Sequence, residues 1–267
     1  MSPAIVDRRY ISAISLRRQE VEDFGRYPFS IPALRKLKRL EFHPAVTFFV
    51  GENGMGKSTL IEAIAVKMGF NPEGGSRNFR FDTRASHSDL HKYLTVEKGV
   101  SRPADGYFLR AESFYNVATE IERLDKEPGG GPLITPSYGG KSLHEQSHGE
   151  SFFSLLLNRL SGHGLYIFDE PEAALSPQRQ MSALTLVHML VQKKSQFIIS
   201  THSPILMAYP NSQIYSLTER GIRKIAYTET EHFQVTQSFL NRHEQMLKVL
   251  LDESDQGDLD ASGPRVQ

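Results

Sequence analysis

A glycine-rich turn between a strand pattern and a helix pattern constrains this chain more than any other feature. Residues 51–58 read Gly-Glu-Asn-Gly-Met-Gly-Lys-Ser and fit G-x-x-x-x-G-K-[ST] in full. The run Val46–Val50 before them is β-branched and aromatic, and apolar residues recur at helical spacing from Lys57 until Gly69. This context predicts a phosphate-binding loop and favours it over a turn that contains a lysine by chance.

Such a loop has a defined chemistry. Its glycines let the backbone bend, so that successive N–H groups and the positive end of the helix face phosphate oxygens. Lys57 supplies a point charge toward the β- and γ-phosphates, and the Ser58 hydroxyl is a ligand for Mg²⁺. We therefore expect ATP and Mg²⁺ as cofactors. The residues expected to contact the nucleotide here are Gly51, Glu52, Asn53, Gly54, Met55, Gly56, Lys57, Ser58 and Thr59.

A second motif supplies acidic groups. The apolar run Leu165–Phe168 predicts a buried strand, and two carboxylates, Asp169 and Glu170, follow it directly. Asp169 is expected to hold Mg²⁺ together with Ser58. Glu170 is expected to orient or deprotonate an attacking water, so Glu170 and Lys57 are candidate catalytic residues. An acidic turn at a strand end is common by itself, but the phosphate loop makes the catalytic interpretation the stronger one.

Strand patterns and helix patterns alternate along the rest of the chain, which predicts an α/β fold with parallel strands covered by helices on both faces. Short β-favouring runs between residues 11 and 50 predict an antiparallel portion at the N-terminus. We expect one domain over residues 1–251, with an insertion at about 71–106, a mobile Gly/Pro-rich loop at 127–141 and a disordered acidic tail at 252–267.

Composition excludes several function classes. The 267 residues include no cysteine, which rules out disulfides and thiolate chemistry and fits a reducing compartment. Thirty-one Lys and Arg balance thirty-one Asp and Glu, so the body is not globally basic as a nucleic-acid binder would be. No apolar run approaches the roughly 20 residues that a membrane span needs. We expect a cytoplasmic protein without direct membrane insertion.

Two further motifs complete an ordered set. Ser147-His148-Gly149-Glu150 precedes a predicted helix, and Thr201-His202-Ser203-Pro204 follows the buried strand pattern Gln196–Ser200. With residues 51–59 and 168–171, they make the chain resemble soluble ABC-type ATPases. This branch of AAA-family proteins includes SMC proteins, double-strand-break repair ATPases and OLD-like bacterial ATPases. The resemblance covers about residues 10–220. It implies a P-loop NTPase fold with an ABC-ATPase-type mixed sheet and a small helical signature subdomain at about 113–162.

The resemblance also implies roles for individual residues. In that family two subunits sandwich two ATP molecules, and the signature of one subunit closes over the γ-phosphate held by the other. An ATP-dependent homodimer is therefore implied, in which Ser147, Gly149 and Glu150 act in trans. His202 matches the histidine that contacts the γ-phosphate and is a candidate catalytic residue. Glu112 follows the strand pattern where the family carries a glutamine, and it is the candidate further metal contact.

Three positions depart from the family pattern. The signature has one glycine where the family usually has two, and Ser176 stands where an aspartate is usual. The stretch Arg110-Ala111-Glu112 contains no glutamine. These departures bear on closure of a dimer more than on nucleotide binding.

The process that ATP hydrolysis serves is less constrained. About 35 residues separate Glu112 from Ser147, which excludes long DNA-bridging arms. We expect an ATPase that drives DNA or a DNA-associated protein partner in maintenance, repair or defence. The alternatives are the nucleotide-binding subunit of a membrane transporter and a non-enzymatic module that uses ATP as a dimerisation clamp. The basic run Arg35–Arg39 is either a DNA contact or a solvated face.

Two histidine patterns suggest a metal site. His144-Glu145-Gln146-Ser147-His148 is a literal H-E-x-x-H, the zinc-protease motif. It follows a Gly/Pro-rich loop and overlaps the signature motif, so we prefer the signature interpretation. His87 and His91 lie four residues apart with no third ligand in view, and we interpret them as solvated side chains.

Overall fold

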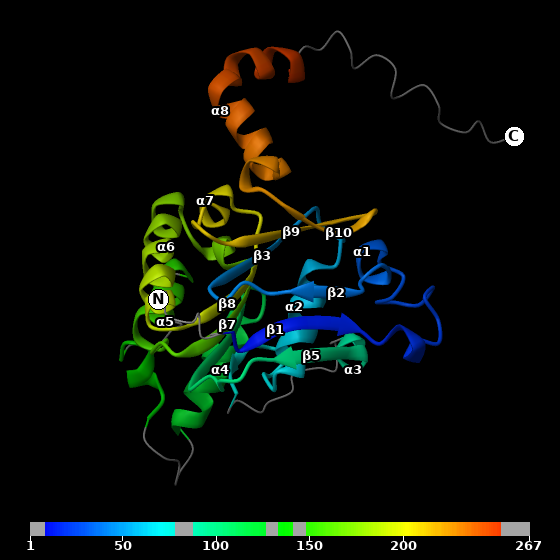
Figure 1. The fold of residues 1–267 in the computed structure, drawn as a ribbon. Helices are drawn as coiled ribbons and strands as arrows, with labels where there is room; N and C mark the ends of the chain where they lie inside the picture. Colours follow the sequence, from blue (N-terminus) through cyan, green and yellow to red (C-terminus); the bar gives the residue numbers. More distant parts are fainter. Residues whose placement is uncertain (1–8, 78–87, 127–132, 141–147, 252–267) are drawn as a thin grey trace, which may run out of the picture.

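The computed structural model describes residues 9–77, 88–126, 133–140 and 148–251. Over these residues the chain forms two β-sheets with helices between and around them (Figure 1). The larger sheet is mixed, with parallel central strands and an antiparallel pair at each edge, which confirms the expected fold class. Its strands, in spatial order, are β10 (Gly221–Ile225), β9 (Gln213–Thr218), β3 (Val46–Val50), β8 (Gln196–Ser200), β7 (Gly164–Asp169), β6 (Asp105–Arg110) and β4 (Gly75–Ser76).

The smaller sheet is antiparallel and forms the N-terminal β portion. Its order is β2 (Arg39–Glu41), β1 (Ile11–Leu16) and β5 (Leu94–Lys98). Ile14 of β1 lies opposite Leu40 on one side and Val96 on the other. The strand β5 comes from the segment at 71–106 that the sequence suggests as an insertion, so this part of the segment is integral to the N-terminal sheet.

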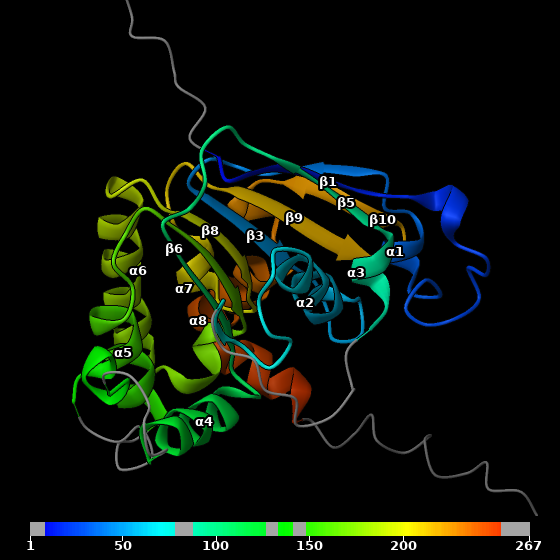
Figure 2. The same ribbon diagram turned by 90° about the horizontal axis from the view of Figure 1, so that it is seen from below.

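Helices cover both faces of the larger sheet. The helix α2 (Lys57–Lys67) packs between the two sheets (Figure 2). The opposite face is covered by α4 (Phe114–Lys126), α5 (His148–Asn158), α6 (Pro177–Gln192) and α7 (Pro204–Met207). The short helix α1 (Pro32–Arg35) packs against β9 and β10, and the short helix α3 (Leu90–Tyr93) packs against α2. Single 3₁₀ turns are η1 (Arg18–Glu20), η2 (Thr135–Tyr138), η3 (Pro171–Ala174) and η4 (Tyr227–Glu229).

The central strands are apolar on both faces because both faces are covered. On β3, Phe48 and Val50 belong to the core shared with α5 and α6, whereas Phe49 belongs to the core shared with α2 and the smaller sheet. All five residues of β3 are buried. This explains why the sequence shows a continuous apolar run there rather than an alternating pattern.

One buried side chain joins the two sheets. Gln196 of β8 is 0% exposed, and its Oε1 accepts hydrogen bonds from the backbone N–H groups of Tyr10 and Ile11, both at 2.9 Å. Its Nε2 donates to the carbonyl oxygens of Ile11 at 2.8 Å and His43 at 3.1 Å. Because all four contacts reach backbone, the smaller sheet is fixed in position against the larger one.

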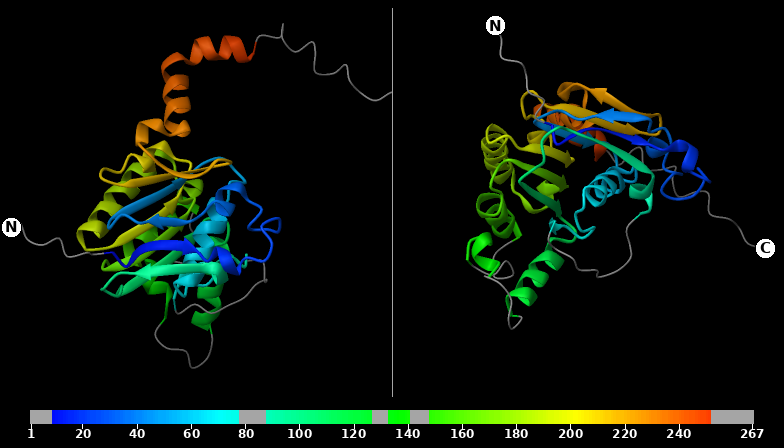
Figure 3. Two further views of the ribbon diagram at one scale, coloured as in Figure 1. Left: turned by 45° about the vertical axis from the view of Figure 1, so that its right-hand side comes forward. Right: turned by 60° about the horizontal axis from the view of Figure 1, so that its bottom comes forward.

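The last helix, α8 (Glu231–Leu250), begins on the body and ends beyond it (Figure 3). Its N-cap is Thr230, which is 0% exposed and whose hydroxyl accepts the N–H of Phe233 at 3.3 Å. This cap places the start of the helix at Glu231. No helix among the described residues combines the length and apolar composition that crossing a bilayer requires.

The Gly/Pro-rich segment expected as a mobile loop is anchored over residues 133–140. Tyr138 is 1% exposed and packs in the core with α4 and α5. The carboxylate of Asp125 accepts the N–H groups of Ile134 at 2.6 Å and Thr135 at 2.9 Å. These contacts hold residues 133–140 against α4 and α5, and the mobility of the stretch stays a prediction. The rest of that loop and the acidic tail lie outside the described residues.

Candidate nucleotide site

The loop between β3 and α2 has a backbone that only glycine adopts easily. Gly51 has φ of +141°, and a Cβ atom there would overlap the carbonyl oxygen of Leu217 on β9. Gly56 has φ of +88°, and a Cβ atom would lie 3.1 Å from Ile31 and Leu34 of the α1 region. The glycine spacing in the sequence therefore reflects both backbone shape and close packing.

Lys57 is folded back beneath this loop. Its Nζ donates to the carbonyl oxygens of Gly51 at 2.8 Å and Glu52 at 3.0 Å. The side chain is buried, and burial lowers its pKa against the opposing influence of the Glu170 and Asp169 carboxylates. The ammonium group thus lies within the curve of the loop, next to acidic side chains.

Asp169 ends β7 and meets the start of α2. Its Oδ1 accepts hydrogen bonds from Ser58 Oγ at 3.1 Å and from Ser200 Oγ at 2.5 Å. The residue is 4% exposed, and burial raises the pKa of its carboxyl to about 6 despite those two hydrogen bonds and the nearby Arg110. A hydroxyl and a carboxylate that already touch offer the hard oxygen donors that Mg²⁺ prefers. Ser58 and Asp169 therefore fit the metal ligands predicted for them.

Glu170 turns the chain out of the strand. It has φ of +50°, a left-handed backbone that is uncommon for a residue with a side chain, and its N–H donates to the Ser200 carbonyl at 3.0 Å. Its carboxylate is part exposed, and Oε1 lies 3.4 Å from Nε2 of His202. The turn therefore points two adjacent carboxylates in different directions. Asp169 is buried and hydrogen-bonded to Ser58, whereas Glu170 faces the cavity.

His202 is held from two sides by residues that the sequence did not indicate. Its backbone N–H donates to Glu172 Oε1 at 2.5 Å, and its ring Nδ1 lies 2.9 Å from Nε2 of His232. His232 comes from the first turn of α8, thirty residues further along the chain. No motif surrounds His232, so only the folded chain reveals it.

A cavity of about 400 Å³ brings together Lys57, Ser58 and Glu170. Glu112 lies at its wall, with its carboxylate 3.3 Å from the guanidinium of Arg110. Tyr27 lies at the same wall, is 59% exposed, and its hydroxyl lies 3.4 Å from Thr59 Oγ1. No motif or spacing in the sequence points to Tyr27. The lining residues are Tyr27, Ile31, Asn53, Gly54, Gly56, Lys57, Ser58, Thr59, Glu112 and Glu170.

The remaining loop residues face a neighbouring cavity. Gly51, Glu52 and Met55 line a space of about 450 Å³ between the loop, the β9–β10 hairpin and the start of α8. Met55 also packs against the core beneath α2. The nine predicted nucleotide contacts are thus divided between two sides of one loop.

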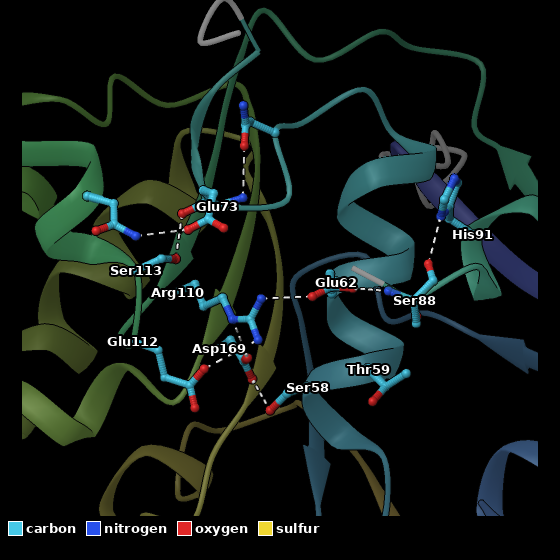
Figure 4. A network of polar contacts seen from close by, with 12 residues as sticks. Ser58, Thr59, Glu62, Glu73, Ser88, His91, Arg110, Glu112, Ser113 and Asp169 are labelled. Atoms are coloured by element: carbon cyan, nitrogen blue, oxygen red, sulfur yellow. Dashed lines mark hydrogen bonds and ion pairs between the residues drawn. The ribbon is translucent and has the colours of Figure 1, made fainter. Parts of the chain in front are cut away.

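Arg110 occupies the strand end where the sequence lacks a glutamine, and it lies within a buried polar network (Figure 4). Its Nη1 is 2.8 Å from Glu62 Oε2, and its Nε is 4.0 Å from Asp169 Oδ2. Glu62 Oε1 in turn accepts the N–H of Ser88 at 3.0 Å. The network connects the metal-side carboxylate, through α2, to the segment that leads into α3.

The signature residues are less completely described. Ser147 lies outside the described residues. Gly149 is buried at the start of α5, where an added Cβ would lie 2.8 Å from the Ala174 carbonyl oxygen, and Glu150 is exposed, 3.8 Å from Arg179. Neither lines the cavity that contains Lys57. The structure therefore does not bring Gly149 or Glu150 to the phosphate loop of the same chain.

The two histidine patterns lie largely outside the described residues. His144, Glu145 and His87 lie outside the described residues, and the Nδ1 of His91 lies 3.0 Å from the Ser88 carbonyl oxygen. Within the part of the chain that the structure describes, no three His, Asp or Glu side chains gather in a way that could hold a metal ion.

Comparisons with known proteins agree with this geometry. A family model described as "AAA domain" matches residues 20–128, which contain the phosphate loop. Another, described as "AAA domain, putative AbiEii toxin, Type IV TA system", matches residues 150–208, which contain Asp169, Glu170 and His202. Comparison with curated proteins gives no match.

Solved structures with a similar fold include an SMC head domain from Thermotoga maritima, with 17% identity and a TM-score of 0.42, covering 81% of this chain and 99% of that one. A nucleotide-free ATP-binding cassette from an ABC transporter has 19% identity and a TM-score of 0.44, covering 75% and 87%. The cbiO1 protein from Clostridium perfringens, part of the ABC transporter complex cbiONQ, has 17% identity and a TM-score of 0.43, covering 81% and 91%.

The phosphate loop between β3 and α2, beside the acidic end of β7, defines a P-loop NTPase fold. Two AAA-domain models match separate parts of the chain, one over the phosphate loop and the other over the acidic end of β7, so the chain is similar to AAA-family proteins in both halves of the site.

Proposed function

We propose that the chain binds ATP with Mg²⁺ and hydrolyses it. One observation carries this proposal: Ser58 is hydrogen-bonded to Asp169 at 3.1 Å, and Ser58, Lys57 and Glu170 line one cavity. A hydroxyl, a carboxylate, an ammonium and a second carboxylate are the groups that phosphoryl transfer to water requires.

Each group has a separate task. Lys57 exchanges its loop carbonyls for phosphate oxygens, and Ser58 and Asp169 hold the metal ion. Mg²⁺, when bound, neutralises the charge on the phosphates. Glu170 stands at the opening, where its carboxylate accepts a proton from or orients the attacking water. His202 donates from Nε2 toward the same place. Glu112, at the cavity wall, is proposed as a further contact to the metal or its waters.

We further propose that two copies assemble with ATP between them. The support is that neither Gly149 nor Glu150 lines the cavity that contains Lys57 of their own chain. A symmetric pair places each signature over the other copy's phosphate loop.

Three variants test the ATPase proposal. Lys57→Ala is expected to lose binding of a fluorescent ATP analogue, because it removes the one ammonium found among the described residues that line the cavity. Glu170→Gln is expected to bind the analogue normally and to lose at least about 100-fold in phosphate release, because the group that acts on water is gone. Glu244→Gln, which removes an exposed carboxylate of α8, is the control and should match wild type.

Light scattering on Glu170→Gln with ATP and Mg²⁺ tests the assembly. A dimer mass with ATP and a monomer mass without it would support the proposal. Unchanged monomer mass at saturating ATP would refute the paired arrangement, and phosphate release untouched by Glu170→Gln would refute the hydrolysis mechanism.

For the partner, we propose DNA, on the evidence of a basic hollow. Arg18, Arg35, Lys36 and Lys38 line a space of about 450 Å³ beside α1, together with Ser30 and Pro32. No acidic side chain is among the described residues that line it. Cations from separate segments that converge on one hollow favour phosphate contact. The fold is equally compatible with the nucleotide-binding subunit of a membrane transporter. The basic hollow is the observation that favours DNA as the partner.

Not every basic residue of the sequence run belongs to this hollow. Leu37 is 1% exposed, and Arg39 forms an ion pair with Glu97 at 2.9 Å and another with Glu41. Arg39→Gln is therefore a matched control for charge removal. Anisotropy of labelled duplex DNA with the Glu170→Gln protein should show ATP-dependent binding that falls with salt and with alanine at Arg18, Arg35, Lys36 and Lys38. Undetectable binding at low salt, despite dimers, would refute the DNA proposal.

A further inference from the structure

We propose that His232 is a positioning residue of the nucleotide site: its Nε2–H donates to His202 Nδ1 and so aims the Nε2–H of His202 at Glu170. The effect of His232 on catalysis rests on the proposed ATPase function. The contact between His232 and His202 does not depend on that function. Through His232, the helix α8, which lies outside both sheets, contributes a residue to the nucleotide site.

The contact between the two rings requires one shared proton. His202 Nδ1 and His232 Nε2 are 2.9 Å apart, with ring centroids 5.0 Å apart and planes inclined by 65°. At that separation one nitrogen donates and the other accepts, because two lone pairs or two N–H groups facing each other would repel. The tautomers of the two histidines are therefore coupled.

The surroundings of His202 select one of the two arrangements. Its Nε2 lies 3.4 Å from Glu170 Oε1 and is buried, without hydrogen-bond geometry to any described partner. If His202 donated from Nδ1, the lone pair on its Nε2 would face a carboxylate. If His232 donates instead, His202 Nε2 carries the proton and faces an acceptor, which is the favourable order.

The surroundings of His232 select the same arrangement. Its Nδ1 is buried and has no hydrogen-bond partner among the described residues. A buried N–H without a partner is rarer than a buried acceptor without one, which places the single proton of the neutral ring on Nε2. Burial, His202 and Lys57 lower the pKa of His232, while Glu231 opposes them, so the neutral ring is the form present at neutral pH.

Several charged groups from different elements face this pair. They are Lys57 of α2, Glu170 after β7, Glu172 of η3 and Glu231 of α8. Glu172 fixes the His202 backbone, with its Oε1 accepting the N–H at 2.5 Å. The backbone of His202 is thus held by η3 and its ring by α8, so loss of His232 frees the ring and not the loop.

Three substitutions of His232 distinguish the effect of its Nε2–H donor from the effect of its ring. The amide nitrogen of glutamine reaches the position of an imidazole Nε2, whereas that of asparagine reaches only the position of Nδ1. We expect His232→Gln to keep kcat within about 3-fold of wild type. His232→Asn and His232→Phe should lose about 10-fold or more in kcat with the Kd for a fluorescent ATP analogue unchanged within about 2-fold, the order of effect of a mispositioned catalytic group.

The control is His188→Asn. His188 lies on α6, is exposed, and contacts the Tyr209 hydroxyl at 3.1 Å, away from the nucleotide site. It should leave kcat unchanged. Equal kcat for His232→Gln and His232→Asn would overturn the proposal, and thermal unfolding of each variant identifies any loss that comes from misfolding.

A measurement without turnover distinguishes this inference from the ATPase proposal. Nitrogen-15 spectra of the histidine-labelled protein, with His202 assigned from its difference to His202→Gln, report which ring nitrogen carries the proton. We expect His202 Nδ1 to be unprotonated and Nε2 protonated in wild type, and this preference to be lost in His232→Phe. A protonated Nδ1 in wild type, or no change in His232→Phe, refutes the positioning role whether or not the protein hydrolyses ATP.

Discussion

The buried carboxyl of Asp169 gives the protein without metal a pH dependence that can be calculated. Its pKa in the folded state is about 6, against about 3.9 in an unfolded chain. A raised pKa means that the folded state disfavours the ionised form, so the free energy of unfolding is largest below pH 4 and falls as pH rises toward 6. Because one pKa unit is about 1.4 kcal/mol, the loss is on the order of 3 kcal/mol by pH 8, and roughly half of it is present by pH 5.

Asp169→Asn removes that loss without removing the side chain. The amide oxygen can still accept from Ser58 and Ser200, but the group cannot ionise. We expect the variant to unfold with a free energy about 2–3 kcal/mol above wild type at pH 8, and with about half that difference at pH 5. Urea unfolding in the presence of EDTA, followed by circular dichroism at both pH values, measures it. Binding of Mg²⁺ with nucleotide should weaken in the same variant.

Asp105→Asn is the matched control with the opposite sign. Burial of Asp105 is outweighed by Arg159 and by hydrogen bonds from Ser161 and Tyr166, so its pKa is lowered. This replacement should therefore destabilise the protein at both pH values. An Asp169→Asn variant that is less stable than wild type at pH 8, or whose advantage is the same at pH 5, would refute the account of Asp169.

Other substitutions test packing and recognition. Gln196→Leu leaves the buried N–H groups of Tyr10 and Ile11 without an acceptor and should lower the free energy of unfolding in urea by about 3 kcal/mol. A loss under about 1 kcal/mol would contradict the proposal that Gln196 holds the two sheets together. Gly51→Ala should abolish ATP-analogue binding while unfolding stays cooperative, and Gly54→Ala, where an added Cβ meets nothing within 4 Å, should bind better than Gly51→Ala. Tyr27→Ala should weaken ATP binding about 10-fold and Tyr27→Phe little, because an exposed ring at the cavity wall offers a stacking face for the base; equal weakening of inorganic triphosphate would exclude that explanation.

The parts of the site that the sequence predicts are those whose chemistry is local. Glycines, a lysine and a serine within eight residues specify a loop by themselves, and a carboxylate after an apolar run must appear at a strand end. The contact between Ser58 and Asp169 follows, because β3 and β7 are near neighbours in one sheet. The roles of Glu112 and of the signature residues stay predictions.

The parts that could not be predicted depend on packing between distant segments. His232 reaches His202 only because Thr230 caps α8 beside η4. Tyr27 stands at the cavity because of the path of an irregular segment with no periodic pattern. Arg39, one of five residues in a basic run, turns out to be neutralised by Glu97, which β5 brings alongside. Charge in a sequence does not report which partner the fold will supply.

The smaller sheet is assembled from pieces on either side of the phosphate loop. β1 and β2 precede β3, whereas β5 follows α2 and reaches back to pair with β1 over Ile11–Leu16. The segments before and after the phosphate loop and α2 therefore both contribute strands to the smaller sheet. Neither half of the chain cut between β2 and β5 contains a complete small sheet, so this layer cannot be produced as an independent fragment. Pairing of β1 with β5 closes about eighty residues, so we expect these strands to pair late in folding. Fragments split in this interval should recover the native layer only when both are present, with nucleotide-binding residues and sheet returning together.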